Sequence, residues 1–145
     1  MKKLAGFLSA AVAVIGLSGC GGGGGGSSSY DHTYYLQTFN GFNYVGVPDV
    51  YYECGPDIVG YTGPNGEFHL RDGDICTFFD LDNTVSYEYG ILYLGANASG
   101  TVALEGVDYT CDSSYPIWRS TDSDGTFTFD PTYYINGDIC DFDFF

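Results

Sequence analysis

The feature that most constrains this chain is an internal repeat that contains four of its cysteines. Each copy reads V-x-Y-x-C, then T-x-x-x-G-x-F-x-[L/F], then G-D-I-C. The first copy occupies 50–54, 62–70 and 73–76, and the second occupies 107–111, 121–129 and 137–140. The first cysteines of the two copies are 57 positions apart (111 − 54). Matches at this many ordered positions indicate an internal duplication, so we expect two similar halves.

Residues inside each copy alternate between apolar and polar with a period of two. Phe127 and Phe129 alternate with polar residues, and Cys140, Phe142 and Phe144 alternate with two aspartates. Such alternation is typical of half-buried β-strands that turn their apolar side to a core. No segment after residue 30 shows a convincing helical period. The sequence therefore predicts an all-β domain.

Glycine dipeptides separate the expected strands: Asn65-Gly66, Asp72-Gly73, Asp124-Gly125 and Asn136-Gly137. These dipeptides tolerate positive φ and favour tight hairpin turns. We therefore predict a hairpin from 67–71 and 74–79. In the second half the insertion of 131–135 predicts a longer hairpin.

The predicted architecture is an antiparallel β-sandwich built from two similar halves, at about 34–90 and 91–145. Two small tandem units are the alternative. A lone half of roughly 57 residues would bury little core, which favours the single sandwich.

The N-terminus has the layout of an export signal. Lys2 and Lys3 precede an apolar run at 4–17, shorter than the roughly 20 residues of a membrane span. The run ends in L-S-G-C, which resembles the lipobox of bacterial lipoproteins. The resemblance implies a signal peptide at 1–19, cleavage after it, and a lipid on the Cys20 sulfur, usually with an acyl chain such as palmitate on the new amino group. An ordinary secretory signal is the alternative.

The residues after Cys20 predict a tethered protein. Because Gly21 follows the cysteine, the lipoprotein resemblance implies an anchor in the bacterial outer membrane. A tract of glycine and serine at 21–29 is typical of a flexible coil. We therefore expect a lipidated tether at 20–32 and one β-domain at 33–145.

Four cysteines remain besides Cys20: Cys54, Cys76, Cys111 and Cys140. An even number in an exported chain predicts disulfides, and four cysteines allow three pairings. If the duplication holds, equivalent cysteines have equivalent partners, which selects Cys54–Cys76 and Cys111–Cys140. A Cys₄ zinc site is the alternative use, but its paired C-x₂₋₄-C spacing is absent.

Charge excludes one class of partner. All 19 acidic residues lie after residue 30, where Arg71 and Arg119 are the only Lys or Arg residues, so the formal charge of this part is 2 − 19 = −17. Nucleic-acid binding needs clustered Lys and Arg, so we expect none. The membrane contact is expected to run through the lipid, because anionic headgroups repel the acidic domain.

The repeat also resembles one in bacterial surface proteins, of the kind grouped with carboxypeptidase-regulatory-like and Ig-like β-domains. The matching residues of the first half are Tyr52, Cys54, Gly60, Thr62, Gly66, Phe68, Gly73, Asp74, Thr77 and Phe78. Those of the second half are Tyr109, Cys111, Thr121, Asp122, Gly125, Phe127, Gly137, Asp138 and Phe142. The chain departs from the pattern at Gly63, Ser120 and Asp141. The resemblance implies a β-sandwich used as a spacer or interaction domain.

Asp122 and Asp124 are the candidate metal ligands. With the following glycine they resemble part of a calcium loop, which places oxygen ligands two positions apart. If Ser120 is the first position of such a loop, the twelfth position, where a calcium loop has glutamate, is Pro131. The first half offers no carboxylate at 63–66. The alternative is a hairpin turn with solvated aspartates. No other cofactor is expected.

Catalysis has little support in the sequence. His32 lies at the end of the tether, and His69 lies on the polar side of its expected strand. No G-x-S-x-G occurs, and oxidised cysteines supply no thiolate nucleophile. A pair of carboxylates can serve glycoside hydrolysis, but 19 acidic residues always supply one. We therefore expect no enzyme.

The expected function is that of a lipid-anchored structural or interaction module of the cell envelope, with an envelope protein or glycan as partner. A carbohydrate-binding or calcium-dependent adhesion module is the alternative. Aromatic side chains decide how far binding is favoured, because they fill β-cores and also anchor interfaces. Binding is favoured if Tyr115, Trp118, Tyr133 and Tyr134 form one exposed patch, and disfavoured if they point inward.

Overall fold

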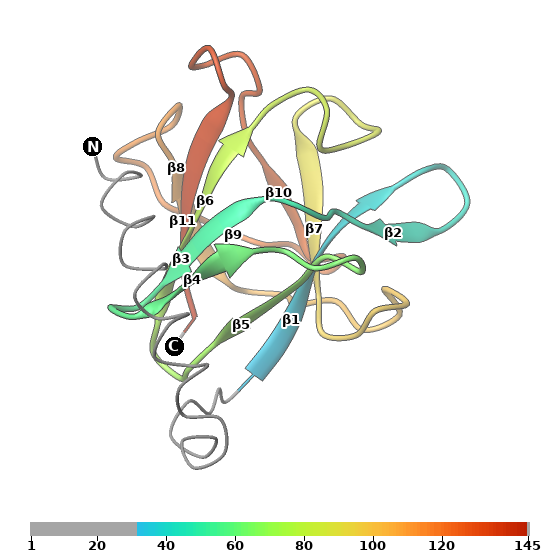
Figure 1. The fold of residues 1–145 in the computed structure, drawn as a ribbon. Helices are drawn as coiled ribbons and strands as arrows, with labels where there is room; N and C mark the ends of the chain where they lie inside the picture. The colour runs from blue at the N-terminus through green and yellow to red at the C-terminus, as the bar shows by residue number, and fades with distance from the viewer. Residues whose placement is uncertain (1–31, 145) are drawn as a thin grey trace.

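The computed structural model describes residues 32–144, so the expected signal peptide, Cys20 and the Gly/Ser tract lie outside the described residues. The described chain forms eleven strands and no helix (Figure 1). In chain order these are β1 (His32–Phe39), β2 (Tyr44–Gly46), β3 (Tyr51–Cys54), β4 (Ile58–Tyr61), β5 (Glu67–Leu70), β6 (Ile75–Leu81), β7 (Ile91–Gly95), β8 (Asp108–Cys111), β9 (Arg119–Ser120), β10 (Thr126–Thr128) and β11 (Asp138–Asp143). Accordingly, this part of the chain has no helix that is long and apolar enough to cross a membrane.

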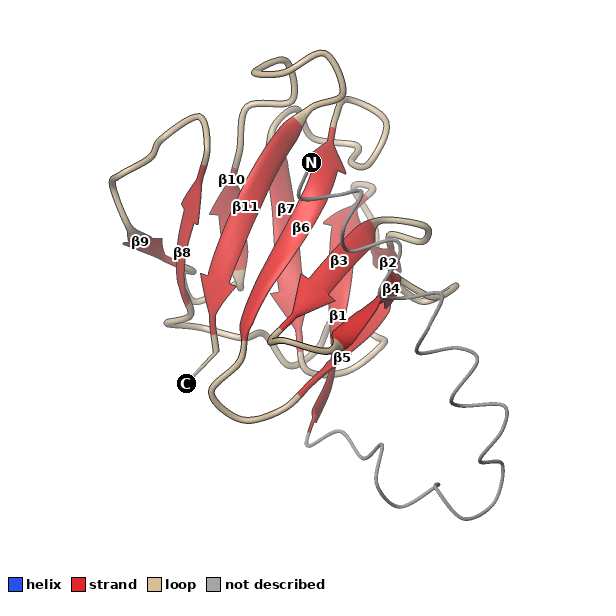
Figure 2. Ribbon diagram, turned by 60° about the vertical axis from the view of Figure 1, so that its left-hand side comes forward, coloured by secondary structure: helices blue, strands red, loops and turns tan. Residues whose placement is uncertain are grey.

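The strands form two antiparallel sheets that pack face to face (Figure 2). One sheet has the order β10-β7-β1-β2, with β5 also paired to β1, and the other has the order β4-β3-β6-β11-β8-β9. Between them lie four fully buried phenylalanines in edge-to-face contact: Phe68 with Phe78 at 4.9 Å, Phe127 with Phe142 at 4.7 Å, and Phe78 with Phe142 at 5.6 Å. The predicted all-β sandwich is confirmed.

The two halves are related by an approximate two-fold axis. In the first sheet Leu36 of β1 lies opposite Leu94 of β7, and in the second Thr77 of β6 lies opposite Asp141 of β11. Each of these four residues is paired with its own counterpart in the other half, and Tyr35↔Gly95 mirrors Gln37↔Tyr93 around the first pair. Both sheets therefore contain strands from both halves, which makes one sandwich and excludes two tandem units.

The repeated threonine and tyrosine make the same hydrogen bonds in both halves. Thr62 Oγ1 donates to the Val47 carbonyl at 2.6 Å and accepts from Val50 N, and Thr121 Oγ1 makes the matching bonds to Leu104 and Val107. Likewise, the Tyr52 hydroxyl accepts from His69 N, and the Tyr109 hydroxyl from Thr128 N, each at 3.1 Å. Because these residues satisfy buried backbone groups, they recur in both copies.

The glycine of the second repeated segment is required by a close approach. A Cβ atom on Gly66 would lie 2.1 Å from the Leu36 carbonyl oxygen, which is far too close. A Cβ atom on Gly125 would lie 2.3 Å from the Leu94 carbonyl oxygen. Both glycines have positive φ, 79° and 76°. Any larger residue would push the turn away from the strand at the two-fold axis.

The prediction that the strands on either side of each glycine dipeptide pair as a hairpin is wrong, although Gly66, Gly73, Gly125 and Gly137 all have positive φ. A tight turn does form before Asn136-Gly137, where Tyr134 and Gly137 exchange two backbone hydrogen bonds. The four turns connect β4 to β5, β5 to β6, β9 to β10 and β10 to β11, and each of these connections crosses from one sheet to the other. The physical reason is the core: Phe68 of β5 packs on Phe78 of β6 from the opposite sheet. A hairpin would place both rings in one sheet and leave the other side of the core open.

Two disulfides join neighbouring strands of the second sheet, Cys54–Cys76 between β3 and β6 and Cys111–Cys140 between β8 and β11. The pairing predicted from the duplication is confirmed. Since all four sulfurs are bonded in pairs, the zinc alternative is excluded.

Candidate interaction surfaces

The candidate calcium ligands lie in the turn between β9 and β10. Asp122 Oδ1 accepts hydrogen bonds from Asp124 N at 2.9 Å and from Thr126 N at 3.0 Å. The hydrogen bond from the Thr126 backbone is the main cause that lowers the pKa of the Asp122 carboxyl below its ordinary value. Both aspartates are exposed. The carboxylate of Asp122 thus closes a turn, and a calcium ion on it remains a prediction.

Within residues 32–144, a single group of three side chains with metal-ligating atoms comes together, formed by Cys111, Asp138 and Cys140. The two cysteines form a disulfide. The third member, Asp138, is fully buried and accepts hydrogen bonds from the protein itself. This group is therefore a structural cluster.

The two histidines lie on neighbouring strands near the start of the domain. His32 Nε2 contacts the Asp72 carboxylate, and His69 Nδ1 lies 2.9 Å from Thr33 Oγ1. Burial lowers the pKa of His69.

The four aromatic residues singled out in the sequence lie on two loops. Tyr115 and Trp118 belong to the loop between β8 and β9 and are 72% and 48% exposed, and Tyr133 and Tyr134 belong to the loop between β10 and β11 and are 48% and 45% exposed. Ile117 and Ile135 beside them are also exposed. We call these six side chains the aromatic loop face: Tyr115, Ile117, Trp118, Tyr133, Tyr134 and Ile135.

Hydrogen bonds hold the two loops together. The Tyr134 hydroxyl donates to Asp112 Oδ2 at 2.8 Å, and its ring meets that of Tyr133 edge-on at 4.7 Å. Asp112 N donates to the Ile139 carbonyl at 2.8 Å. The two loops are thus in contact through Tyr134 and Asp112.

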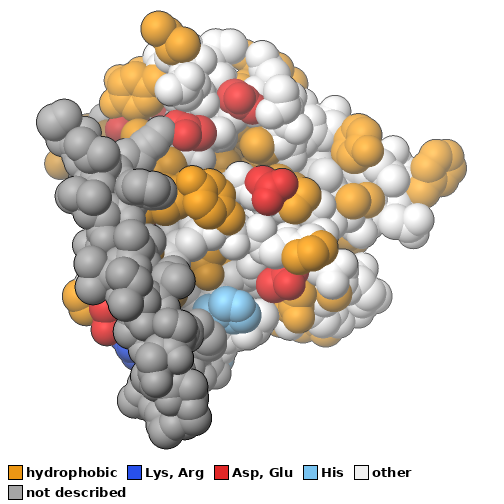
Figure 3. All heavy atoms as spheres, in the orientation of Figure 1, with side chains coloured by type: hydrophobic (Ala, Val, Ile, Leu, Met, Phe, Trp, Pro, Cys, Tyr) orange, Lys and Arg blue, Asp and Glu red, His pale blue; other side chains and the backbone are white. Residues whose placement is uncertain are grey.

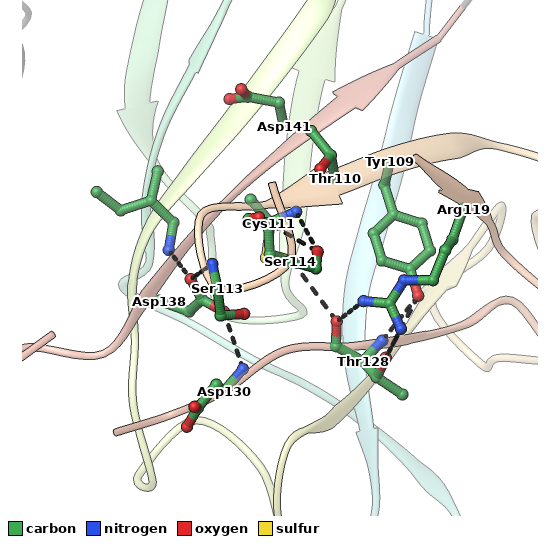
Figure 4. Close-up of a disulfide and its surroundings, with 12 residues drawn as sticks. Tyr109, Thr110, Cys111, Ser113, Ser114, Arg119, Thr128, Asp130, Asp138 and Asp141 are labelled. Carbon is green, nitrogen blue, oxygen red and sulfur yellow. Dashed lines mark hydrogen bonds between the residues drawn. A yellow bond between two sulfur atoms is a disulfide. The ribbon is translucent and has the colours of Figure 1, made fainter. Parts of the chain in front are cut away.

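Asp138 fixes this arrangement from beneath (Figure 4). Its carboxylate accepts from the Ser113 hydroxyl at 2.5 Å and from Ser113 N at 3.2 Å. It also accepts from Asp130 N at 2.8 Å and Ile139 N at 2.9 Å. One buried side chain therefore binds the starts of both loops, next to the Cys111–Cys140 disulfide.

The β10–β11 loop, which carries Tyr133, Tyr134 and Ile135 of the aromatic loop face, lies at the end of the sandwich away from the start of β1 (Figure 1). In Figure 1 the chain begins β1 at the lower end, while the loop between β10 and β11 is at the top. Pairing agrees with this view, because β1 begins beside Leu70 and the β10–β11 turn at Gly137 packs on the carbonyl of Leu81, at the other end of β6.

A second surface feature, a groove of about 1000 Å³ in the first half, was missed by the sequence analysis. One wall is formed by 45–51 and the other by 79–87, and Thr38 and Tyr61 complete it. Tyr51 and Phe79 are buried at its base, whereas Tyr61 and Tyr87 at its rim are 59% and 70% exposed. We call this the first-half groove.

The alternation of residues in β3 could have predicted one groove residue, Tyr51. Tyr52 and Cys54 face the core, so their neighbour Tyr51 must face outward. Nothing in the sequence indicated that Tyr87, some 36 residues later (87 − 51), would lie beside it.

Comparison with protein-family models, with curated protein sequences and with solved structures finds no match to this chain.

Proposed function

We propose that this protein is a lipid-anchored lipoprotein of the bacterial outer membrane whose β-sandwich is a non-catalytic interaction module. The observation that carries the proposal is the aromatic loop face, in which the four aromatic residues named above are each exposed, on two loops joined by the hydrogen bond from Tyr134 to Asp112. Export is supported by the signal-like N-terminus, and by two disulfides that suit an oxidising compartment.

The chemistry of the aromatic loop face suits a protein partner. Tyr and Trp supply large contact area with few rotatable bonds, and they are the residue types enriched at binding hot spots. Because Asp138 and the disulfide hold both loops in place, little conformational entropy is lost on binding. The β10–β11 part of the face also lies at the opposite end of the sandwich from the start of β1 (Figure 1), so a partner can approach it while the lipid stays in the membrane.

The anchor is tested by Cys20→Ala. We expect the wild-type protein to incorporate labelled palmitate and to sediment with outer membranes, and the variant to do neither. A variant that still sediments with the membrane would overturn the lipid anchor, and would leave the binding proposal standing.

The binding face is tested by cross-linking in intact cells. We expect one envelope protein to cross-link to the wild type and to be lost from the triple variant Tyr115→Ala, Trp118→Ala and Tyr133→Ala. Phe42→Ala is the matched control, because Phe42 is an exposed aromatic residue on the β1–β2 loop. Equal cross-linking by the triple variant and the wild type would remove the function from this face.

A further inference from the structure

The two halves of the sandwich provide an internal comparison for the first-half groove. Residues with equal positions in the two halves can be matched through the strand registers, since Tyr51↔Tyr61 in β3 and β4 corresponds to Asp108↔Ser120 in β8 and β9. A side chain that the fold requires should recur at both positions. One that serves only the first half should not.

The core side chains recur at equivalent positions of the two halves, whereas the aromatic side chains of the groove do not. Inward residues recur: Tyr52 matches Tyr109, and Phe78 matches Phe142. The outward aromatic cluster does not recur, because Tyr51, Tyr61 and Phe79 correspond to Asp108, Ser120 and Asp143. In the second half Ser120 Oγ donates to Asp108 Oδ1 at 2.6 Å, where the first half has two tyrosine rings 5.3 Å apart. The sandwich therefore forms with or without aromatic residues at these three positions.

Asp49 on the groove wall gives a second contrast. It has φ of 63°, whereas its counterpart Gly106 has φ of 81°, and both donate their backbone N–H to the carbonyl of the repeated threonine at 2.9 Å. The left-handed region favours glycine, and an aspartate fits it less well than glycine does. The first half thus keeps a carboxylate in the groove at a position where the second half has the residue that suits the backbone.

The groove is held in shape before any ligand arrives. The ring of Tyr51 packs against Phe79 at 5.4 Å, and its hydroxyl donates to Glu53 Oε2 at 3.0 Å. On the far wall, Tyr87 N donates to Thr38 Oγ1 at 2.9 Å, which fixes the loop that carries the exposed Tyr87 ring. Preformed concave sites of this size are typical of ligand binding.

Charge limits what the groove can hold. Asp49 and Asp82 line it, and none of its described lining residues is Lys, Arg or His. Hydrophobic side chains and carboxylates also intermingle over the middle of the face shown in Figure 3. Phosphorylated and uronic-acid ligands are therefore repelled.

The pairing of the backbone further limits which ligands the groove can bind. At the base of the groove β3 is already paired with β4 and β6, and β6 with β3 and β11. A peptide cannot add a strand there, because strand addition needs an unpaired sheet edge. The ligand must instead be held by ring faces and by side-chain acceptors.

We propose that the first-half groove binds an uncharged oligosaccharide. Each pyranose ring has an apolar C–H face, which suits the exposed rings of Tyr61 and Tyr87, and hydroxyl groups that donate hydrogen bonds to the Asp49 carboxylate. This site is separate from the aromatic loop face, and neither proposal depends on the other.

The test uses the full-length lipoprotein, purified in detergent, on an array of uncharged cello-, manno-, xylo- and malto-oligosaccharides. Oligogalacturonate and a lysine-rich peptide are the charged comparisons. We expect binding to at least one uncharged chain and to neither charged probe. No binding to any uncharged chain, or tighter binding to the lysine-rich peptide, overturns the proposal.

Three variants locate the site. Tyr61→Ser copies the residue of the second half, and Tyr87→Ala alters a loop, so both should fold; together they should weaken binding roughly tenfold or more. Asp49→Gly should raise the melting temperature by a few degrees, because glycine suits the left-handed backbone there, while it weakens binding. Phe42→Ala is the control, because Phe42 is an exposed aromatic residue that does not line the groove, and it should bind as the wild type does. Unchanged binding by the Tyr61→Ser, Tyr87→Ala double variant overturns the site.

Discussion

Thr77 and Asp141 lie directly opposite each other on β6 and β11, and the Thr77 hydroxyl donates a hydrogen bond to Asp141 Oδ1 at 2.7 Å. The two residues hold the same position in the two copies of the repeat, 64 residues apart (141 − 77). The approximate two-fold axis of the sandwich therefore passes between them. The position is a contact between the two halves, and its two residues differ because one donates and the other accepts.

We predict that this pair couples the halves measurably. In a double-mutant cycle with Thr77→Val and Asp141→Ala, the coupling in the free energy of unfolding should be about 0.5–1.5 kcal/mol, the net value of one half-buried hydrogen bond. Urea unfolding of the four proteins measures it. Asp143→Ala in place of Asp141→Ala is the control cycle, because Asp143 lies opposite Ile75. Strict additivity in the first cycle would contradict the role given to the pair.

The two aspartates of the repeated G-D-I-C should differ in their effect on stability. Asp138 is fully buried and accepts four hydrogen bonds, whereas Asp74 is half-buried and accepts one from Arg71 N at 2.8 Å. Buried donors left without a partner are costly. We expect Asp138→Ala to lower the free energy of unfolding by about 2–4 kcal/mol and Asp74→Ala by about 1 kcal/mol. Equal losses in urea unfolding would contradict this account.

The two disulfides should contribute nearly equally. They close chain segments of 22 and 29 residues, and in the chain-entropy model such loops stabilise by about 3–4 kcal/mol each. We expect the double variants Cys54→Ala, Cys76→Ala and Cys111→Ala, Cys140→Ala to lose similar amounts in urea unfolding. Replacing both cysteines of a pair avoids a free thiol. A much larger loss from one pair would mean that its surroundings, and not the closed loop, set its contribution.

Local sequence patterns predicted local structure correctly. They failed where the structure depends on contacts between segments far apart in the sequence. Alternation gave the strands and the inward face, as Phe127 and Phe142 show, and the duplication selected the disulfide pairs. The dipeptide Asp72-Gly73 correctly indicated positive φ, but φ does not say which sheet the next strand joins. That choice depends on the core contact between Phe68 and Phe78, which the sequence did not reveal.

The two candidate surfaces also differ in how far local sequence could predict them. Sequence analysis singled out the four aromatic residues of the aromatic loop face, but it left open whether they are exposed or point inward, and the structure shows that they are exposed. The first-half groove depends on loop 82–90 lying beside 45–51, and no sequence spacing encodes such a contact. Only the outward position of Tyr51 was readable in advance, from the alternation of β3.

Acid should weaken the fold partly through Asp122. Because its folded pKa is lowered, the carboxylate stabilises the fold above the ordinary value of 3.8, and this contribution is lost as the pH falls through the lowered folded value. In Asp122→Asn the amide oxygen can still accept the same hydrogen bonds. We therefore expect the melting temperature of the variant to fall less steeply below about pH 4. Asp124→Asn is the control, and an equal flattening by it would contradict this assignment.

Calcium should leave the melting temperature unchanged if Asp122 serves the turn. Its Oδ1 already accepts from Asp124 N and Thr126 N, which leaves Asp124 as the other carboxylate of the turn. A site with a dissociation constant of about 1 mM would stabilise the fold by about 1.4 kcal/mol in 10 mM calcium, and so raise the melting temperature by several degrees. A shift of that size is easily measured against a chelator. If it appeared in the wild type and vanished in Asp122→Asn with Asp124→Asn, the turn would be a calcium site. A shift that survived both substitutions would place the ion elsewhere on this acidic surface.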